Sequence, residues 1–144
     1  MNNATHRVAE EAARITASRV SASQRLNFLP RHFGRYMMKV ESSIYDQFRE
    51  IAPAYDGGFW HYVDLSNGGC YLAPEGETFL IDQPSNYFRG IVSADAAGVI
   101  VTLYVLSAMS FKYSEEPLFA DHFHQLREFA AEHGEAALIF SAID

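Results

Sequence analysis

Residues 55–74, YDGGFWHYVDLSNGGCYLAP, have the pattern of an aromatic β-hairpin. The dipeptide Asn67-Gly68 favours a two-residue type I′ turn, because Asn and Gly both tolerate the positive φ that the two central positions of this turn require. With that turn, Leu65 lies opposite Cys70, and the pairing continues back along both strands. We therefore expect the hairpin to set the register of the sheet.

Alternation along the strands divides the predicted hairpin into two faces. The face expected to point into the core contains Phe59, His61, Val63, Leu65, Cys70 and Leu72. The opposite face is mixed aromatic and polar, with Trp60, Tyr62, Asp64, Tyr71 and Ala73. Trp and Tyr rings either pack under a helix with their polar tips satisfied or form a rigid surface for a partner. Both interpretations stay open, and four residues of this face are candidate interaction residues: Trp60, Tyr62, Asp64 and Tyr71.

The chain before the hairpin is predicted to be helical. Residues 4–20 are rich in Ala, the strongest helix former. A second helix is expected to start at Pro30, since Pro is favoured at the first helical position. A third is expected from about Ser42 to Pro53, because Pro cannot continue a helix.

The chain after the hairpin returns from strands to helices. Residues 77–82 and 87–92 have the pattern of two short strands with a turn between them. Three helical segments follow, one capped by Ser93, one over residues 116–133 and one over residues 135–143. This order predicts a single α+β domain, in which N-terminal and C-terminal helices pack around an antiparallel sheet of about four strands.

The composition is typical of one globular domain. The 144 residues are 49% apolar and 20% charged, enough to build a core without a metal or a disulfide. The single cysteine, Cys70, makes no internal disulfide, which indicates a cytoplasmic protein. No apolar stretch follows Arg7 and Arg14, so no secretory signal is expected. The longest apolar run, residues 96–109, is shorter than the roughly 20 residues that a membrane span needs and is interpreted as a buried helix, with no membrane partner.

The net charge of −7 is unevenly distributed. Residues 1–49 carry eight basic and four acidic residues, whereas the remainder carries three basic and 14 acidic residues. Arg31, Arg35 and Lys39 form a basic row at helical spacing, which could contact phosphates. His32 lies beside this row and is a candidate with it. The alternative is a solvated helix face, and mimicry of DNA is disfavoured because the 18 acids are scattered and opposed by 11 basic residues.

Motifs for catalysis or metal binding do not occur in the sequence. The six histidines have no metal-ligand spacing, and His122 and His124 would point about 200° apart on a helix. Cys70 lies in a predicted strand with no histidine placed near it by the sequence, so an unreactive core thiol is expected. The adjacent acids Glu115 and Glu116 precede a helix start, where acids are favoured for capping. We therefore predict no catalytic residue, no metal and no cofactor.

Four segments occur together in an order and spacing that resemble the ArdB/KlcA antirestriction family. They are RLNFLPRHFGRYMM, the hairpin segment YDGGFWHYVDLSNGGCYLAP, FRGIVSADAAGVIVTLYVLS and the final LREFAAEHGEAALIFSAID. The joint occurrence of these segments is specific. The resemblance covers residues 23–144, which are taken as the antirestriction domain, and leaves residues 1–22 as an N-terminal helical arm.

The resemblance implies a non-enzymatic protein of plasmids and other mobile elements that relieves host type I restriction of incoming DNA. Its partner would be a type I restriction-modification complex, reached through protein or protein-DNA contacts. The family has no established catalytic residues to carry over. Two alternatives stay open: a small DNA-binding accessory protein that uses Arg31, Arg35 and Lys39, and a small hydrolase with an unrecognised site.

Overall fold

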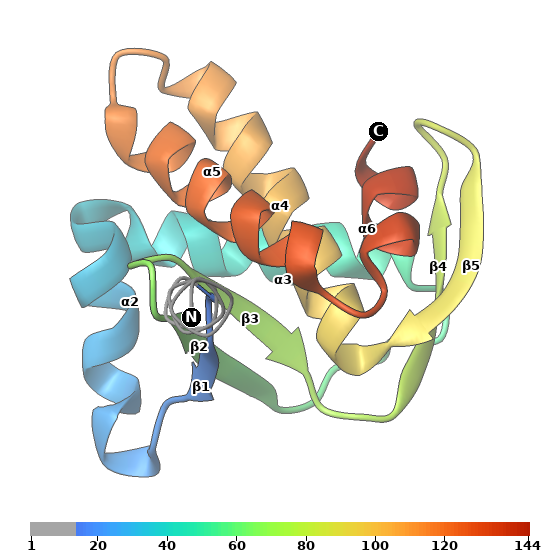
Figure 1. Ribbon diagram of the computed structural model, residues 1–144, viewed down its shortest axis with the longest axis horizontal. Helices are drawn as coiled ribbons and strands as arrows, with labels where there is room; N and C mark the ends of the chain where they lie inside the picture. The colour runs from blue at the N-terminus through green and yellow to red at the C-terminus, as the bar shows by residue number, and fades with distance from the viewer. Residues whose placement is uncertain (1–13) are drawn as a thin grey trace, which may run out of the picture.

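The computed structural model describes residues 14–144. In chain order, the elements are β1 (Ala17–Arg19), η1 (Ala22–Gln24), α2 (Arg25–Phe33), η2 (Gly34–Tyr36), α3 (Met37–Ile51), β2 (Trp60–Leu65), β3 (Cys70–Pro74), β4 (Thr78–Gln83), β5 (Phe88–Ser93), α4 (Ala94–Lys112), α5 (Pro117–Glu132) and α6 (Ala136–Ile143). The strands form two antiparallel sheets, β1-β2-β3 and β4-β5. Helix α4 contacts α3, α5, α6 and both sheets (Figure 1). The predicted α+β class is confirmed, with five described strands in two sheets where about four in one sheet were expected.

The central hairpin forms between β2 and β3, but its register differs by one residue from the prediction. Asp64 pairs with Cys70, so a three-residue loop joins the two strands. The backbone N–H of Gly68 donates to Leu65 O at 3.0 Å, and that of Leu65 donates to Gly69 O at 2.9 Å. Gly68 has a φ of 94° and is the only loop residue with positive φ. This pattern is a type I turn followed by a glycine bulge, and the predicted type I′ turn is wrong.

Contacts with α5 explain the longer loop. The Asn67 side-chain amide donates to Gln125 O at 2.9 Å, and Asn67 Oδ1 accepts from the Gly69 N–H at 3.1 Å. A Cβ on Gly69 would lie 2.8 Å from Gln125 Cβ, which only glycine avoids. These contacts hold the turn in a conformation that the dipeptide Asn67-Gly68 alone does not specify.

The one-residue shift exchanges the two faces of β3 relative to the prediction. One face now contains Trp60, Tyr62, Asp64, Cys70 and Leu72, and the other contains His61, Val63, Tyr71 and Ala73. Helices cover both faces: Phe28 of α2 stacks on Tyr62, and Phe129 of α5 stacks on Tyr71. Neither face of the hairpin is an open surface.

Strand β1 occupies part of the segment predicted as an N-terminal helix. Residues Ala17–Arg19 pair antiparallel with β2, from Ala17 opposite Leu65 to Arg19 opposite Val63. A free hairpin edge has unpaired backbone groups, and satisfying them outweighs the weak helix preference of a short segment. The helix prediction is therefore wrong for Ala17–Arg19, and its part before residue 14 lies outside the described residues. The boundary at residue 22 stays a prediction.

Helices α2 and α3 both begin earlier than predicted. Helix α2 starts at Arg25, so that Pro30 lies inside it and not at its first position. The helix extends upstream because its buried face begins at Phe28, which has no exposed surface. It ends at Gly34, whose φ of 52° is accessible to glycine at little cost. Helix α3 ends before Pro53, as predicted.

The second hairpin and the last two helices agree with the prediction to within one residue at almost every boundary. Strands β4 and β5 pair from Thr78 opposite Ser93 to Gln83 opposite Phe88. Helix α6 packs against β5, and the Asn86 side-chain amide donates to a carbonyl of α6 at 2.9 Å. The second sheet is thereby attached to the C-terminal end of the chain.

Helix α4 forms the centre of the core. Ser93 caps it as predicted, with its Oγ accepting from the Ala96 N–H at 3.1 Å. Gly98 lets β3 approach closely, since a Cβ there would lie 2.4 Å from Leu72 O. Thr102 Oγ1 accepts from the Leu72 N–H at 3.3 Å, so α4 covers the free edge of β3. Among the described helices, α4 alone is long and apolar enough to cross a membrane, but 67% of its apolar window is buried in the protein, as in a core helix.

Candidate functional site

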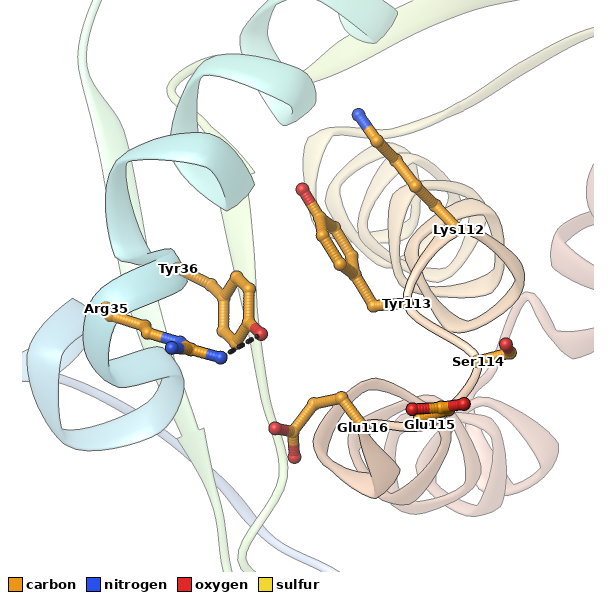
Figure 2. Close-up of a pocket in the computed structure, with 7 residues that line it drawn as sticks. All are labelled: Arg35, Tyr36, Lys112, Tyr113, Ser114, Glu115 and Glu116. Carbon is orange, nitrogen blue, oxygen red and sulfur yellow. Dashed lines mark hydrogen bonds between the residues drawn. The ribbon is translucent and has the colours of Figure 1, made fainter.

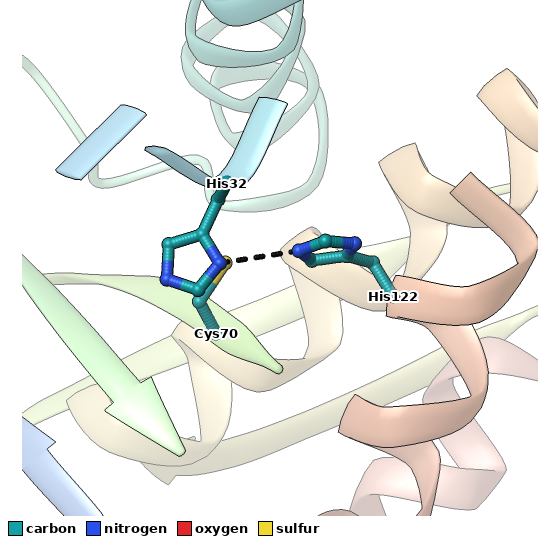
Figure 3. A group of neighbouring side chains, drawn as sticks. All are labelled: His32, Cys70 and His122. Atoms are coloured by element: carbon teal, nitrogen blue, oxygen red, sulfur yellow. Dashed lines mark hydrogen bonds between the residues drawn. The ribbon is translucent and has the colours of Figure 1, made fainter. Parts of the chain in front are cut away.

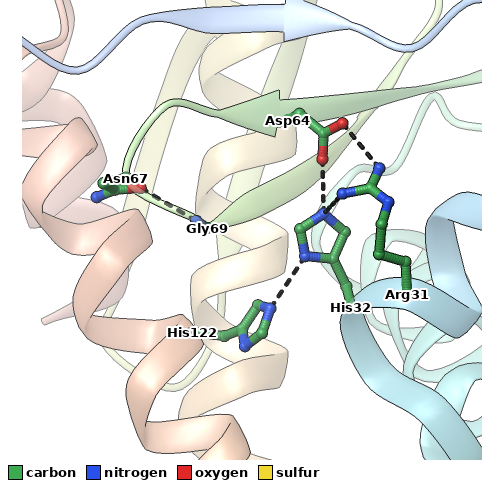
Figure 4. Close-up of polar contacts among 6 residues, drawn as sticks. All are labelled: Arg31, His32, Asp64, Asn67, Gly69 and His122. Atoms are coloured by element: carbon green, nitrogen blue, oxygen red, sulfur yellow. Dashed lines mark hydrogen bonds and ion pairs between the residues drawn. The ribbon is translucent and has the colours of Figure 1, made fainter.

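Four side chains form a polar chain where α2, β2 and α5 meet (Figure 4). His32 Nε2 lies 2.6 Å from Asp64 Oδ1, and His32 Nδ1 lies 3.2 Å from His122 Nε2. Arg31 Nη2 donates to Asp64 Oδ2 at 2.8 Å. At the other end, His122 Nδ1 lies 3.1 Å from Leu118 O. We call this group the histidine network: Arg31, His32, Asp64 and His122.

The groups at the two ends determine where the imidazole hydrogens lie. A carbonyl and an ionised carboxylate only accept, so we assign hydrogens to His122 Nδ1 and His32 Nε2; for His32 Nε2, the 2.6 Å contact with Asp64 decides over the longer 3.3 Å contact with Arg31 Nη1, which is itself a donor. Burial works against ionised Asp64, but hydrogen bonds from Arg31 and His32 outweigh it and lower the pKa of this carboxyl. Burial lowers the pKa of His32 and of His122, which favours neutral rings. In two neutral rings, the nitrogens that face each other both lack hydrogen.

Cys70 adds a sulfur to the network. Its Sγ and one nitrogen each of His32 and His122 lie within 4.8 Å of one another, and all three side chains are buried (Figure 3). The sequence pattern places no histidine near Cys70, whereas the structure brings two to it, because the two rings come from the distant elements α2 and α5. The thiol has no exposed surface, and burial raises the pKa of Cys70 well above its usual value. A buried, protonated thiol is a poor nucleophile for a substrate from solution.

The aromatic candidates lie in the core. The exposed fractions of Trp60, Tyr62 and Tyr71 are 3%, 9% and 2%. Their polar tips have internal partners, since Tyr62 donates to Glu41 and Tyr71 donates to Asp95, each at 2.6 Å. The burial fits the packing interpretation, and covering helices would have to move before a partner could reach these rings.

The predicted basic row is divided among three elements. Arg31 lies on α2, Arg35 on η2 and Lys39 on α3, because Gly34 interrupts the helix between the first two. The Arg31 side chain is 51% exposed and is paired with Asp64. Arg35 and Lys39 belong to a different part of the surface.

An open hollow of about 490 Å³ is lined by Arg35 and by residues at the end of α4 (Figure 2). Tyr36 and Tyr113 stand beside each other in it, with ring centres 5.1 Å apart. The ammonium groups of Lys39 and Lys112 lie 5.9 and 5.5 Å from the Tyr113 ring centre, and these neighbouring cations, Lys39 above all, lower the pKa of Tyr113. We call this surface the tyrosine hollow: Arg35, Tyr36, Lys39, Lys112, Tyr113, Ser114, Glu115 and Glu116.

The tyrosine hollow has the composition of a binding surface. Met38 adjoins it and is 74% exposed, and Phe111 beside Lys112 in the chain is 82% exposed. Aromatic, methionine and arginine side chains are enriched at protein interaction surfaces. Glu116 is used for structure, since it caps α5 by accepting from a backbone N–H at 3.2 Å. No signal in the sequence points to Lys112 or Tyr113, because the end of an apolar core helix does not indicate which segment it meets.

The fold and these sites define a small α+β protein with a buried polar network and a cationic, aromatic hollow at its surface. Residues 53–144 match the family of antirestriction proteins, and the chain belongs to that family. Two antirestriction proteins KlcA of Escherichia coli are 45% and 42% identical to it, over 90% of this chain in each case and 95% and 94% of the relatives. The resemblance of the four sequence segments is therefore confirmed.

A solved structure has a similar fold. It has a TM-score of 0.84 and 44% sequence identity with this chain, and the match covers 90% of this chain and 95% of the other. The KlcA and ArdB proteins to which it belongs are described as having a novel fold and antirestriction activity against type I DNA restriction systems in vivo but not in vitro.

Proposed function

We propose that this protein relieves type I restriction of incoming DNA, that it does so without catalysing a reaction, and that it acts in the cytoplasm on the restriction-modification complex or its DNA complex. The observation that carries the proposal is the 44% identity and TM-score of 0.84 to a structure from proteins that act against type I systems in vivo. At this similarity, the surface as well as the fold is expected to be shared in part.

The chemistry of the described residues supports action by binding. The cysteine that lies near two histidines is fully buried, so it has no access to a substrate. In the tyrosine hollow, Glu116 is engaged in capping α5, and the hollow is open to solvent and does not enclose a reactant. We infer that the hollow is where a protein or protein-DNA surface docks.

The experiment is a restriction assay in living cells, since the activity of the relatives is described in vivo but not in vitro. Unmodified phage is plated on a host with an active type I system, with and without expression of this chain. Plating efficiency should rise with expression and should not change on a host without the restriction system. Unchanged plating on the restricting host, with the folded protein present in the cells, would refute the proposal.

A charge-reversal pair locates the contact surface. The variant R35E/K39E/K112E reverses the three cations of the tyrosine hollow and should abolish most of the rise in plating efficiency. The matched control is R49E/R89E/R127E, which reverses three exposed arginines that do not line the hollow and should retain the activity. If both variants protect phage as well as the wild type does, the hollow is not the docking surface, and the antirestriction function is unaffected by that result.

The second candidate is a DNA-binding accessory protein, favoured by the convergence of Arg35, Lys39 and Lys112 beside two tyrosine rings. The third cation beside Arg35 and Lys39 is Lys112, and not Arg31 as the sequence pattern predicted. Three phosphate contacts would give weak binding. The logarithm of the binding constant should fall with a slope of about −2.7 against the logarithm of the salt concentration. A gel shift that is missing at low salt, or that survives R35E/K39E/K112E, would exclude this candidate.

A further inference from the structure

Three metal-binding side chains converge inside the protein from elements that are far apart in the sequence. His32 lies on α2, Cys70 on β3 and His122 on α5 (Figure 3). We propose that these three residues bind a zinc ion, which ties the two helices to the central hairpin. The site is separate from the tyrosine hollow, and the proposal does not depend on the antirestriction function.

The two facing imidazole nitrogens are the first reason for the proposal. The outer nitrogen of each ring faces an acceptor, Asp64 Oδ1 or Leu118 O, so His32 Nδ1 and His122 Nε2 are the nitrogens left to bind a metal. These two nitrogens lie 3.2 Å apart. Zinc–nitrogen bonds of about 2.0–2.1 Å at a tetrahedral angle hold two nitrogens about 3.3 Å apart, close to this distance.

The outer hydrogen bonds are the second reason. A histidine that binds a metal through one nitrogen almost always donates the other N–H to a carboxylate or a backbone carbonyl, which fixes the ring and its tautomer. Asp64 Oδ1 takes this role for His32 at 2.6 Å, and Leu118 O takes it for His122 at 3.1 Å. Arg31 in turn holds Asp64 at 2.8 Å. The support that a zinc site requires around its ligands is therefore complete for both rings.

The cysteine completes the donor set. Its sulfur lies within 4.8 Å of one nitrogen of each ring, and a zinc ion bound to all three would hold each sulfur–nitrogen pair about 3.6 Å apart. On binding, the S–H bond breaks, the sulfur–zinc bond forms, and the proton leaves to solvent. The Cys70 thiolate would then offset one of the two charges of the ion, and the Asp64 carboxylate, shared between His32 and Arg31, would lie on the far side of the His32 ring.

The donor types favour zinc over the common alternatives. Imidazole and thiolate are ligands of zinc, whereas magnesium and calcium require oxygen ligands. Because the ligands come from α2, β3 and α5, the ion would link three elements that are otherwise joined only by packing and hydrogen bonds. Binding of zinc to the folded protein alone would therefore raise the melting temperature.

The first test is zinc stoichiometry on the full, tag-free chain after removal of metal with a chelator. Zinc is titrated against a chromophoric chelator, and the bound metal is measured by elemental analysis after gel filtration. We expect one tight equivalent, a higher melting temperature in zinc, and loss of both effects in C70S and H122Q. The matched control is H124Q, which removes an exposed histidine of the same helix and should bind like the wild type. Zinc binding that is absent, or equal in wild type, C70S and H122Q, would overturn the proposal.

The second test does not depend on the folding of any variant. Cobalt(II) replaces zinc in the wild-type protein, and its absorption spectrum reports both tetrahedral geometry and a sulfur-to-cobalt charge-transfer band. A spectrum without the sulfur band excludes Cys70 as a ligand and overturns the site. The variant D64N keeps all three ligands but replaces the carboxylate that orients His32 with a neutral amide, so its zinc affinity should fall by about 10- to 100-fold. An affinity equal to that of the wild type would contradict the assigned role of His32.

Discussion

Replacement of Gly98 by alanine should destabilise the protein, although alanine is the better helix former. The new Cβ would lie 2.4 Å from Leu72 O and 2.6 Å from Ala73 Cα, and both are backbone atoms that no side-chain rotation can move away. Overpacking a core costs about 1–3 kcal/mol. Displacing β3 also weakens the hydrogen bond from Leu72 N to Thr102 Oγ1, which contributes about 1 kcal/mol. The helix propensity of alanine offsets about 1 kcal/mol, so we expect a net loss of about 1–3 kcal/mol in the free energy of unfolding.

The assay is urea unfolding followed by the fluorescence of the single tryptophan, Trp60, which is 3% exposed in the folded protein. The denaturation midpoint of G98A should fall with little change in the slope of the transition. The control is G134A, because no atom lies within 4 Å of a Cβ at Gly134 and its φ is not positive. We expect G134A to match the wild type or to gain up to about 1 kcal/mol. A G98A protein as stable as the wild type would refute the close packing of α4 on β3.

Three further predictions concern single polar side chains. Asp95 lies 2.8 Å from His133 and raises the pKa of this imidazole above its usual 6.5. The ion pair therefore stabilises the folded protein fully below about pH 6.5, and this stabilisation is lost as pH rises through the raised pKa of His133 in the folded protein. The melting temperature of the wild type should fall over this pH range, and that of H133Q should not. S93A removes the cap of α4 and the hydrogen bond from Ser93 Oγ to Glu135, and should cost about 1–2 kcal/mol in chemical denaturation, most of which S93T should restore. N67A removes the bond to Gln125 O and the bond accepted from the Gly69 N–H, should cost about 2 kcal/mol, and should accelerate hydrogen exchange of the turn amides, whereas unchanged exchange would argue against the role of this side chain in the turn.

Features whose signals are local can be predicted from this sequence. Ser93 caps α4, Pro53 lies beyond the end of α3, and the strands of the second hairpin are recognisable from their own residues. Each depends on interactions between neighbours in the chain. The α+β class follows from the order of these elements, and the buried character of α4 follows from its uninterrupted apolar composition.

Features that depend on contacts between distant segments are not predictable in the same way. Residues Ala17–Arg19 form a strand because the edge of β2 is available, and no pattern within the segment indicates this edge. The tyrosine hollow similarly requires Arg35 to meet Lys112, which lie on separate elements. A helical row of Arg31, Arg35 and Lys39 is reasonable from spacing alone, but the helix breaks at Gly34, where φ is positive, and Arg31 lies apart from Arg35 and Lys39.

Helix α5 connects the register of the hairpin with the proposed zinc site. The dipeptide Asn67-Gly68 is compatible with loops of two or three residues, and the bond from Asn67 to Gln125 O, 58 residues away, selects the longer one. A shift of one residue turns every side chain of β3 to the opposite face, so a two-residue loop would direct Cys70 away from His32. His122 lies one turn before Gln125 on α5. The helix that supplies one ligand therefore also holds the turn that brings the cysteine to it, which explains why histidine spacing alone does not reveal the cluster.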